Sequence, residues 1–249
     1  MSLQPIDYLN GISSLIYVSV SIVVGLIILA KYFKLRDINF IFVGFTWIGM
    51  SEPWIPSGIS FLCNLFTQMG LSLEIYVIIG NVFIPASVLC WLFAFTSMIY
   101  PEKKKPILIT YFIIGIIIEV ILFYILFFEP TFISTLIGTF ATESQLVRID
   151  IEYKALILAY LLFIDITMLI TGILFSRESL KSESPEIKLK GWLLLLAFLF
   201  WSIGGLLDSA LPLNIITLPI TRLLLVLSGI LFYFGFLLPP WIKRLIIKQ

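Results

Sequence analysis

The stretch WLLLLAFLFWSIGGLLDSALPLNIITLPITRLLLVLSGILFYFGFLL, residues 192–238, decides the fold of this chain. It contains two apolar runs, Trp192 to Leu211 and Ile215 to Leu238. Each is as long as the ~20 residues that a helix needs to cross the hydrocarbon core of a bilayer. The three residues between them, 212–214, leave room for a tight return and nothing longer. The stretch therefore predicts a transmembrane helical hairpin.

This hairpin carries two charges inside its apolar runs. Asp208 lies one turn before the return and Arg222 two turns after it. At a rise of ~1.5 Å per residue their depths differ by about one turn, which an arginine side chain can span. A charge in the apolar zone costs about 2.5 to 3.5 kcal/mol, so such residues normally face the bundle interior and find partners. We expect the two side chains to pair and to form the wall of a polar site.

The composition requires a bilayer around most of the chain. Of 249 residues, 60% are hydrophobic and 12% are charged, and the mean hydropathy is +1.11. A soluble domain cannot hide that much apolar surface. The net charge of +1 and the lack of a basic tail argue against a nucleic-acid partner. The chain has no histidine, which argues against zinc hydrolases, Ser-His proteases and haem bundles.

Five more apolar stretches precede the hairpin, so the sequence predicts an all-α membrane protein with a bundle of seven transmembrane helices. Pro53 and Pro56 should stop or kink the second helix, and Pro85 interrupts the third. The short apolar stretch Ser57 to Met69 is expected to be a helical extension or an interfacial segment. The seven predicted helices are residues 11–30, 39–54, 72–99, 107–128, 155–175, 192–211 and 215–238.

The basic residues predict the orientation in the plasma membrane. With seven spans, all of the 16 Lys and Arg residues except Arg148, Lys154 and Arg222 fall on one side. The positive-inside rule then places the C-terminus in the cytoplasm and the N-terminus outside. Trp54 is expected near the outer interface, where aromatic residues gather.

Two segments outside the spans have patterns of their own. Val147 to Glu152 alternates with period two and, with Thr131 to Phe140, predicts an extracellular β-hairpin between the fourth and fifth helices. After Pro239 and Pro240, apolar residues at positions 241, 242, 245 and 246 alternate with cations. This pattern predicts a short amphipathic helix on the inner leaflet.

The intramembrane polar residues suggest an outward-facing pocket for a small ligand. Helical spacing places Trp201 on the face of Asp208, and Tyr233 on the face of Arg222. A structural interpretation stays open: the charged pair could fix helix register, the outer glutamates could sit among lipid headgroups, and the aromatic residues could pack helices together. The candidate ligand-binding residues are Asp208, Arg222, Glu74, Glu119, Trp201, Tyr233, Asp165 and Glu52.

The segment Ser228 to Arg244, SGILFYFGFLLPPWIKR, resembles the end of a known sensory module. It is similar to the seven-helix membrane-sensing module at the N-terminus of many prokaryotic sensor histidine kinases, in which a Phe-Tyr-x-Gly-Phe run leads to Pro, Trp and basic residues. This resemblance implies a receptor-like protein that signals to cytoplasmic domains. The sequence stops at Gln249, where a kinase would continue, so we expect either a separate cytoplasmic partner or a longer parent protein.

The first hypothesis is therefore a non-enzymatic, receptor-like sensor of a small ligand, with the lipid bilayer, a cytoplasmic signalling partner and a second copy of the chain as candidate partners. The alternative is a small-molecule or ion transporter or channel, with Asp165 and Glu119 on the path. An aspartyl protease is disfavoured because Asp165 and Asp208 differ in depth and lack a flanking motif. No enzymatic activity, cofactor or metal is expected.

Overall fold

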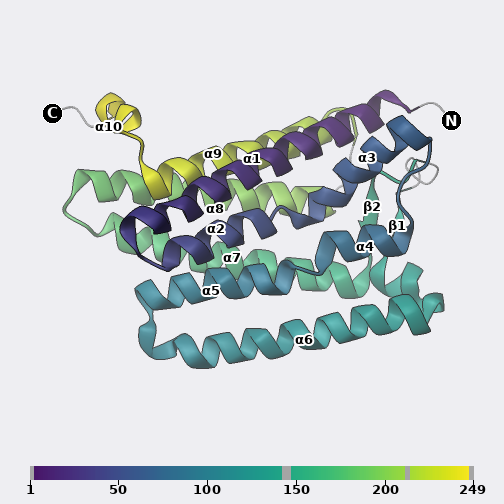
Figure 1. The fold of residues 1–249 in the computed structure, drawn as a ribbon, viewed down its shortest axis with the longest axis horizontal. Coiled ribbons are helices and arrows are strands. Elements are labelled where there is room, and N and C mark those ends of the chain that lie inside the picture. Colours follow the sequence, from purple (N-terminus) through teal and green to yellow (C-terminus); the bar gives the residue numbers. More distant parts are fainter. Residues whose placement is uncertain (1–2, 142–146, 211–213, 247–249) are drawn as a thin grey trace.

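The structure is a computed structural model that describes residues 3–141, 147–210 and 214–246. Long helices run back and forth along one axis, with the N-terminus and a small sheet at one end and the last helix at the other (Figure 1). The predicted end of the sixth span at Leu211, its joint at residues 212 and 213, and residues 142–146 of the predicted hairpin lie outside the described residues. The main elements are α1 (Pro5–Leu35), α2 (Asn39–Gly49), η1 (Glu52–Trp54), α3 (Ile55–Thr67), α4 (Leu73–Asn81), α5 (Ile84–Ile99), η2 (Pro101–Lys103), α6 (Lys104–Phe128), η3 (Pro130–Phe132), η4 (Ile133–Ile137), β1 (Gly138–Phe140), β2 (Ile151–Tyr153), α7 (Ala155–Leu180), α8 (Pro185–Ala210), α9 (Thr217–Leu237) and α10 (Pro240–Ile246).

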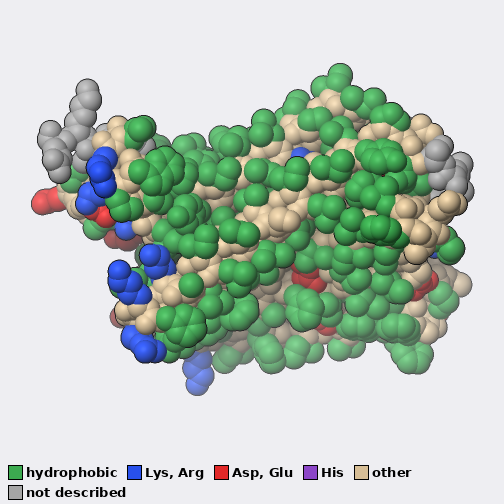
Figure 2. Space-filling view, turned by 45° about the horizontal axis from the view of Figure 1, so that its top comes forward, with side chains coloured by type: hydrophobic (Ala, Val, Ile, Leu, Met, Phe, Trp, Pro, Cys, Tyr) green, Lys and Arg blue, Asp and Glu red, His purple; other side chains and the backbone are tan. Residues whose placement is uncertain are grey.

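The helices and the surface confirm an all-α membrane protein. Within the described part of the chain, six helical stretches are long and apolar enough to cross a membrane: Pro5–Leu35, Leu73–Ile99, Pro101–Phe128, Ala155–Leu180, Pro185–Ser209 and Thr217–Leu237. Hydrophobic side chains cover the flank of the bundle, and Lys and Arg side chains gather mainly at the end that carries α10 (Figure 2). An apolar flank of this kind is stable only against lipid.

The second predicted span is not one helix. α2 ends at Gly49, the 3₁₀ turn η1 follows, and α3 continues to Thr67. Pro53 and Pro56 explain the interruption, since proline has no N–H to donate and its ring clashes with the preceding turn. The three pieces follow one another along the bundle (Figure 1). The stretch from Ser57 is therefore a helical extension, as one of the two sequence interpretations held.

The third predicted span is also broken. α4 ends at Asn81 and α5 begins at Ile84, directly before Pro85. Pro85 stands at the first turn of the new helix, where its missing N–H costs least. The two breaks face each other: a Cβ added at Gly80 of α4 would lie 3.1 Å from the ring of Pro56. Non-helical backbone is therefore enclosed by protein at this level, as the interior of a bilayer requires.

Aromatic rings fill the centre of the bundle. Trp47 of α2 stacks on Phe232 of α9 with 3.7 Å between ring centroids, and Phe232 meets Phe198 of α8 edge to face. Trp91 of α5 lies 4.9 Å from Phe198. All four rings are almost completely buried. They join α2, α5, α8 and α9 into one core, on the side of the two breaks that is nearer to α10.

The predicted hairpin is shorter than expected. β1 and β2 form an antiparallel pair in which Thr139 faces Glu152. Residues 130–137, expected as strand, instead form two short helical turns, η3 and η4. Ile133 and Ile137 bury their side chains against α6 and α7, and this packing outweighs the strand propensity of the apolar run.

The predicted amphipathic helix is α10. Ile242 is buried, whereas Trp241 and Leu245 are exposed. The ammonium of Lys243 forms an ion pair with Glu186 at the start of α8, at 2.5 Å. The last helix is therefore attached to α8 as well as to α9.

Candidate functional site

A cavity of about 90 Å³ lies in the half of the bundle that carries the sheet, open at one side. Such a space holds several water molecules or a small organic molecule. Its wall combines aromatic rings with titratable groups, the usual composition of a ligand pocket. The lining residues are Met50, Pro53, Trp54, Ser57, Tyr76, Ile84, Asp150, Ile151, Tyr153, Leu161, Leu162, Ile164, Asp165, Trp201, Gly205, Leu206, Asp208, Ser209 and Arg222.

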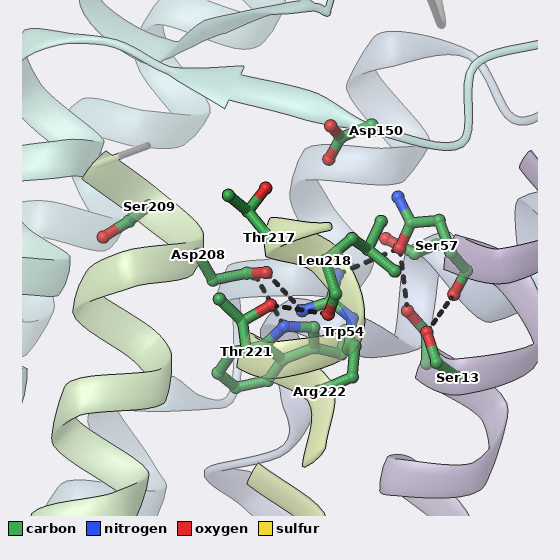
Figure 3. A network of polar contacts seen from close by, with 12 residues as sticks. Ser13, Trp54, Ser57, Asp150, Asp208, Ser209, Thr217, Leu218, Thr221 and Arg222 are labelled. Carbon is green, nitrogen blue, oxygen red and sulfur yellow. Dashed lines mark hydrogen bonds and ion pairs between the residues drawn. The ribbon is translucent and has the colours of Figure 1, made fainter. Parts of the chain in front are cut away.

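The polar centre of the wall is the ion pair between Arg222 of α9 and Asp208 of α8. One carboxylate oxygen of Asp208 accepts from Arg222, and the other accepts from the indole N–H of Trp54 at 2.8 Å. A second guanidinium nitrogen of Arg222 donates to the amide oxygen of Asn10 in α1, at 2.9 Å. In Figure 3, Arg222 and Trp54 lie on the same side of the Asp208 carboxylate, both within its reach. Four separate elements therefore meet at one charged group.

An aromatic wall adjoins this pair. Tyr17 of α1 meets Trp54 edge to face at 5.0 Å, and the indole N–H of Trp201 donates to the Tyr17 hydroxyl at 3.1 Å. Trp54 is only 5% exposed, so its ring faces the interior of the bundle instead of the lipid. Its N–H is needed by a buried carboxylate, and that bond draws the ring inward.

Asp165 of α7 enters the cavity from the opposite wall. One of its carboxylate oxygens is buried and has no hydrogen bond of good geometry among the described residues, although the Ser202 hydroxyl of α8 lies nearby. The neighbouring wall at Gly205 of α8 is open: a Cβ there would meet Asp165 Oδ1 at 3.7 Å and Trp54 at 4.0 Å, both ordinary contacts. Asp165 is therefore an acceptor with space beside it.

The segment 147–150 covers the cavity and is tied down by three side chains. Ser60 and Asn64 of α3 donate to the carbonyls of Arg148 and Val147, at 2.5 Å and 2.6 Å. Tyr76 of α4 donates to the Ile149 carbonyl at 3.0 Å. These bonds fix the backbone of a segment that has no regular secondary structure.

Asp150 at the end of this cover lines the cavity. Figure 3 shows it on the loop that overlies the charged pair. Burial, and next the negative charge of Asp208, raise the pKa of Asp150 to about 7, against the attraction of Arg222. Its carboxyl therefore changes charge near neutral pH.

The eight residues expected from the sequence divide into three groups. Four of them line the cavity together: Asp208, Arg222, Trp201 and Asp165. Glu52 and Glu119 lie near the break between α4 and α5 and are absent from the lining. Glu74 near the start of α4 and Tyr233 near the end of α9 are likewise absent from it.

Several lining or supporting residues escaped the sequence analysis, notably Asn10, Tyr17, Tyr76 and Asp150. Asn10 and Tyr17 lie with Ser14 and Ser21 on one polar face of α1, and this helical spacing was the available signal for both. The sequence did place residues 147–152 over one mouth of the bundle, and this was the available signal for Asp150.

Comparison with known protein families, curated proteins and solved structures finds no match to this chain. Within the described residues, no group of three or more His, Cys, Asp and Glu side chains is placed to hold a metal ion.

Proposed function

We propose that this chain is a receptor-like sensor of the plasma membrane that binds a small polar or amphipathic molecule in the cavity. One observation carries the proposal: the buried pair Arg222 and Asp208 lies in the wall of a cavity instead of a solid core. A pair that served only to hold helices together would gain from complete packing. Asp165, Asp150 and two tryptophans give the same space further groups for recognition.

In this proposal the chain crosses the bilayer seven times, with the N-terminus outside. α2, η1 and α3 together supply the second crossing, which no single helix of that region is long enough to make. The cations gathered at the α10 end support a cytoplasmic C-terminus. The cavity then lies in the outer half of the membrane, below the segment 147–150.

The signal would pass through α8 and α9. These helices are joined at the outer end by Asp208 and Arg222, and α8 is joined to α10 at the other end by Glu186 and Lys243. A ligand that binds better to one arrangement of α8 against α9 shifts the population of that arrangement and moves α10. A cytoplasmic partner, or a second copy of the chain, would bind α10 in only one of its positions. This agrees with the resemblance to the kinase sensory module.

Filling the cavity tests this proposal. The purified chain is screened in detergent for small molecules that raise its unfolding temperature, and the hits are repeated on Gly205→Leu. Because the Cβ position at Gly205 is open, we expect this variant to fold and to lose the response to the hits. Ile203→Leu, on the exposed side of the same helix, is the matched control and should keep it. Equal responses in the wild type and Gly205→Leu would contradict binding in this cavity.

A second function, transport of a small molecule or ion, is favoured by one specific observation. Asp165 offers a buried oxygen that lacks a good hydrogen bond within the described part of the chain, and two neighbouring helices are broken near the cavity, as in many transporters. Flux across proteoliposomes that is abolished by Asp165→Asn would support transport over sensing. If the small molecules found in the screen do not cross the proteoliposome membrane, the result would support the sensor.

A further inference from the structure

Two carboxylates approach each other at the break between α4 and α5, outside the cavity lining. Glu52 of η1 is 2% exposed. Its Oε1 accepts from the backbone N–H of Phe83 at 2.8 Å, whereas its Oε2 is buried without a hydrogen-bond partner in the described structure. Glu119 of α6 also has a buried Oε2 without a partner. The two side chains are close enough for their negative charges to repel each other.

Helix packing brings Glu119 to the level of this break. A Cβ at Gly115 of α6 would lie 2.8 Å from the ring of Pro85, so the two helices touch there. α5 and α6 run in opposite directions (Figure 1). Glu119, one turn beyond Gly115, therefore comes level with Asn81, one turn before Pro85.

Asn81 supplies another unsatisfied oxygen at this level. It is 2% exposed, and its amide nitrogen donates to the Val77 carbonyl at 2.9 Å and to the Tyr153 hydroxyl at 3.2 Å. The bond to a carbonyl fixes which end of the amide is nitrogen. Its Oδ1 is buried and has no partner among the described residues. The backbone carbonyl of Asn81 also loses its usual helical donor, because Pro85 has no N–H.

All these unsatisfied atoms are oxygen acceptors, and two of them belong to carboxylates. Burying a carboxylate without a partner is costly, and a second like charge nearby adds to the cost. Within the described residues, neither Glu52 nor Glu119 forms an ion pair with a Lys or Arg. A positive charge with several oxygen contacts would satisfy the whole group at once.

We propose that Glu52, Glu119 and Asn81 bind a hard monovalent cation, Na⁺, at the break between α4 and α5. Hard cations take carboxylate and carbonyl oxygens as ligands. Ca²⁺ takes six to eight oxygens, often from several carboxylates, whereas this group offers two carboxylates and the oxygens of one asparagine, so we assign it to a monovalent ion. The ion joins η1, α4 and α6, and it is distinct from the ligand of the cavity.

The test is thermal unfolding of the full chain in detergent, titrated with NaCl, KCl or N-methylglucamine chloride at constant ionic strength. We expect a saturable rise in Tm that NaCl produces and the other salts do not. Glu119→Gln should weaken the apparent Na⁺ affinity at least about tenfold, the loss typical even for an outer ligand. Glu52→Gln should do the same, because its amide oxygen can still accept from Phe83.

The matched control is Glu74→Gln. It removes the charge of an acid near the start of α4, far from the break, and should keep the full response to Na⁺. Identical curves in the three salts, or an unchanged Na⁺ response in Glu119→Gln, would overturn the assignment. A stabilisation that depends on pH and is equal in all salts would assign the positive charge to a proton and also overturn it. Because Glu119 is absent from the cavity lining, none of these outcomes bears on ligand binding in the cavity.

Discussion

Arg222 is the residue on which the sheet-bearing half of the bundle depends. It is 3% exposed, and it links its own helix to Asp208 of α8 and Asn10 of α1, while Asp208 holds Trp54 of η1. A buried charge keeps its place only when its partners are fixed, so this one side chain sets the relative positions of four elements.

Removal of one partner from this pair should cost more than removal of both. Arg222→Met leaves Asp208 buried without its cation, and we expect a loss of about 3 to 5 kcal/mol, as found for buried pairs. Arg222→Met combined with Asp208→Asn should recover part of that loss, because the asparagine oxygen still accepts from Trp54. Unfolding free energies measured in detergent for Arg222→Met, Asp208→Asn and the double variant form the cycle with the wild type. Strictly additive losses would show that the two side chains are not coupled.

Asp150 should make stability depend on pH near neutrality. Its pKa is about 7 in the folded chain against an ordinary value of 3.8, so the folded state holds this proton more tightly than the unfolded state. The resulting stabilisation is complete below about pH 4 and is lost as the pH rises through 7. We expect the Tm of the wild type to fall by a few degrees between pH 5 and 8. Asp150→Asn should reduce this slope, whereas Glu152→Gln on the neighbouring strand should leave it unchanged.

At the scale of elements, the broken helices are what make room for a site. An unbroken second or third helix would present only side chains to its neighbours. The breaks before Pro56 and Pro85 instead expose backbone groups, bring Trp54 inward and leave Glu52 beside α5. Proline chemistry is local, so the sequence located both breaks correctly.

The cover 147–150 depends on side chains of α3 and α4. Tyr76→Phe removes the donor to the Ile149 carbonyl and the bond of 2.6 Å to Ser57. Losing a bond of this kind costs about 0.5 to 1.5 kcal/mol, so amide hydrogen exchange in residues 147–153 should become up to about tenfold faster. Tyr124→Phe, on the exposed face of α6, is the control. Unchanged exchange in Tyr76→Phe would mean that the remaining bonds suffice to hold the cover.

At the scale of the whole molecule, the distribution of charge predicts the orientation. Cysteine labelling of intact cells measures it directly, after the free cysteines Cys63 and Cys90 are replaced by alanine. A membrane-impermeant maleimide should label Asn214→Cys and should not label Lys103→Cys. The opposite pattern would invert the proposed topology and turn the cavity toward the cytoplasm.

The sequence by itself determined which long apolar stretches are helical, where prolines break them, and that Asp208 and Arg222 share a depth. These features are local: they follow from hydropathy, from the helical rise per residue and from the missing N–H of proline. Only the tertiary structure decided that Asn10, Tyr17 and Trp54 join the pair, that Asp165 and Asp150 share its cavity, and that Glu74 and Tyr233 do not. The physical reason is that lipid tails are as apolar as the packed interior. The few polar residues of a transmembrane helix can therefore show which face turns inward, but not which residues of the other helices they meet.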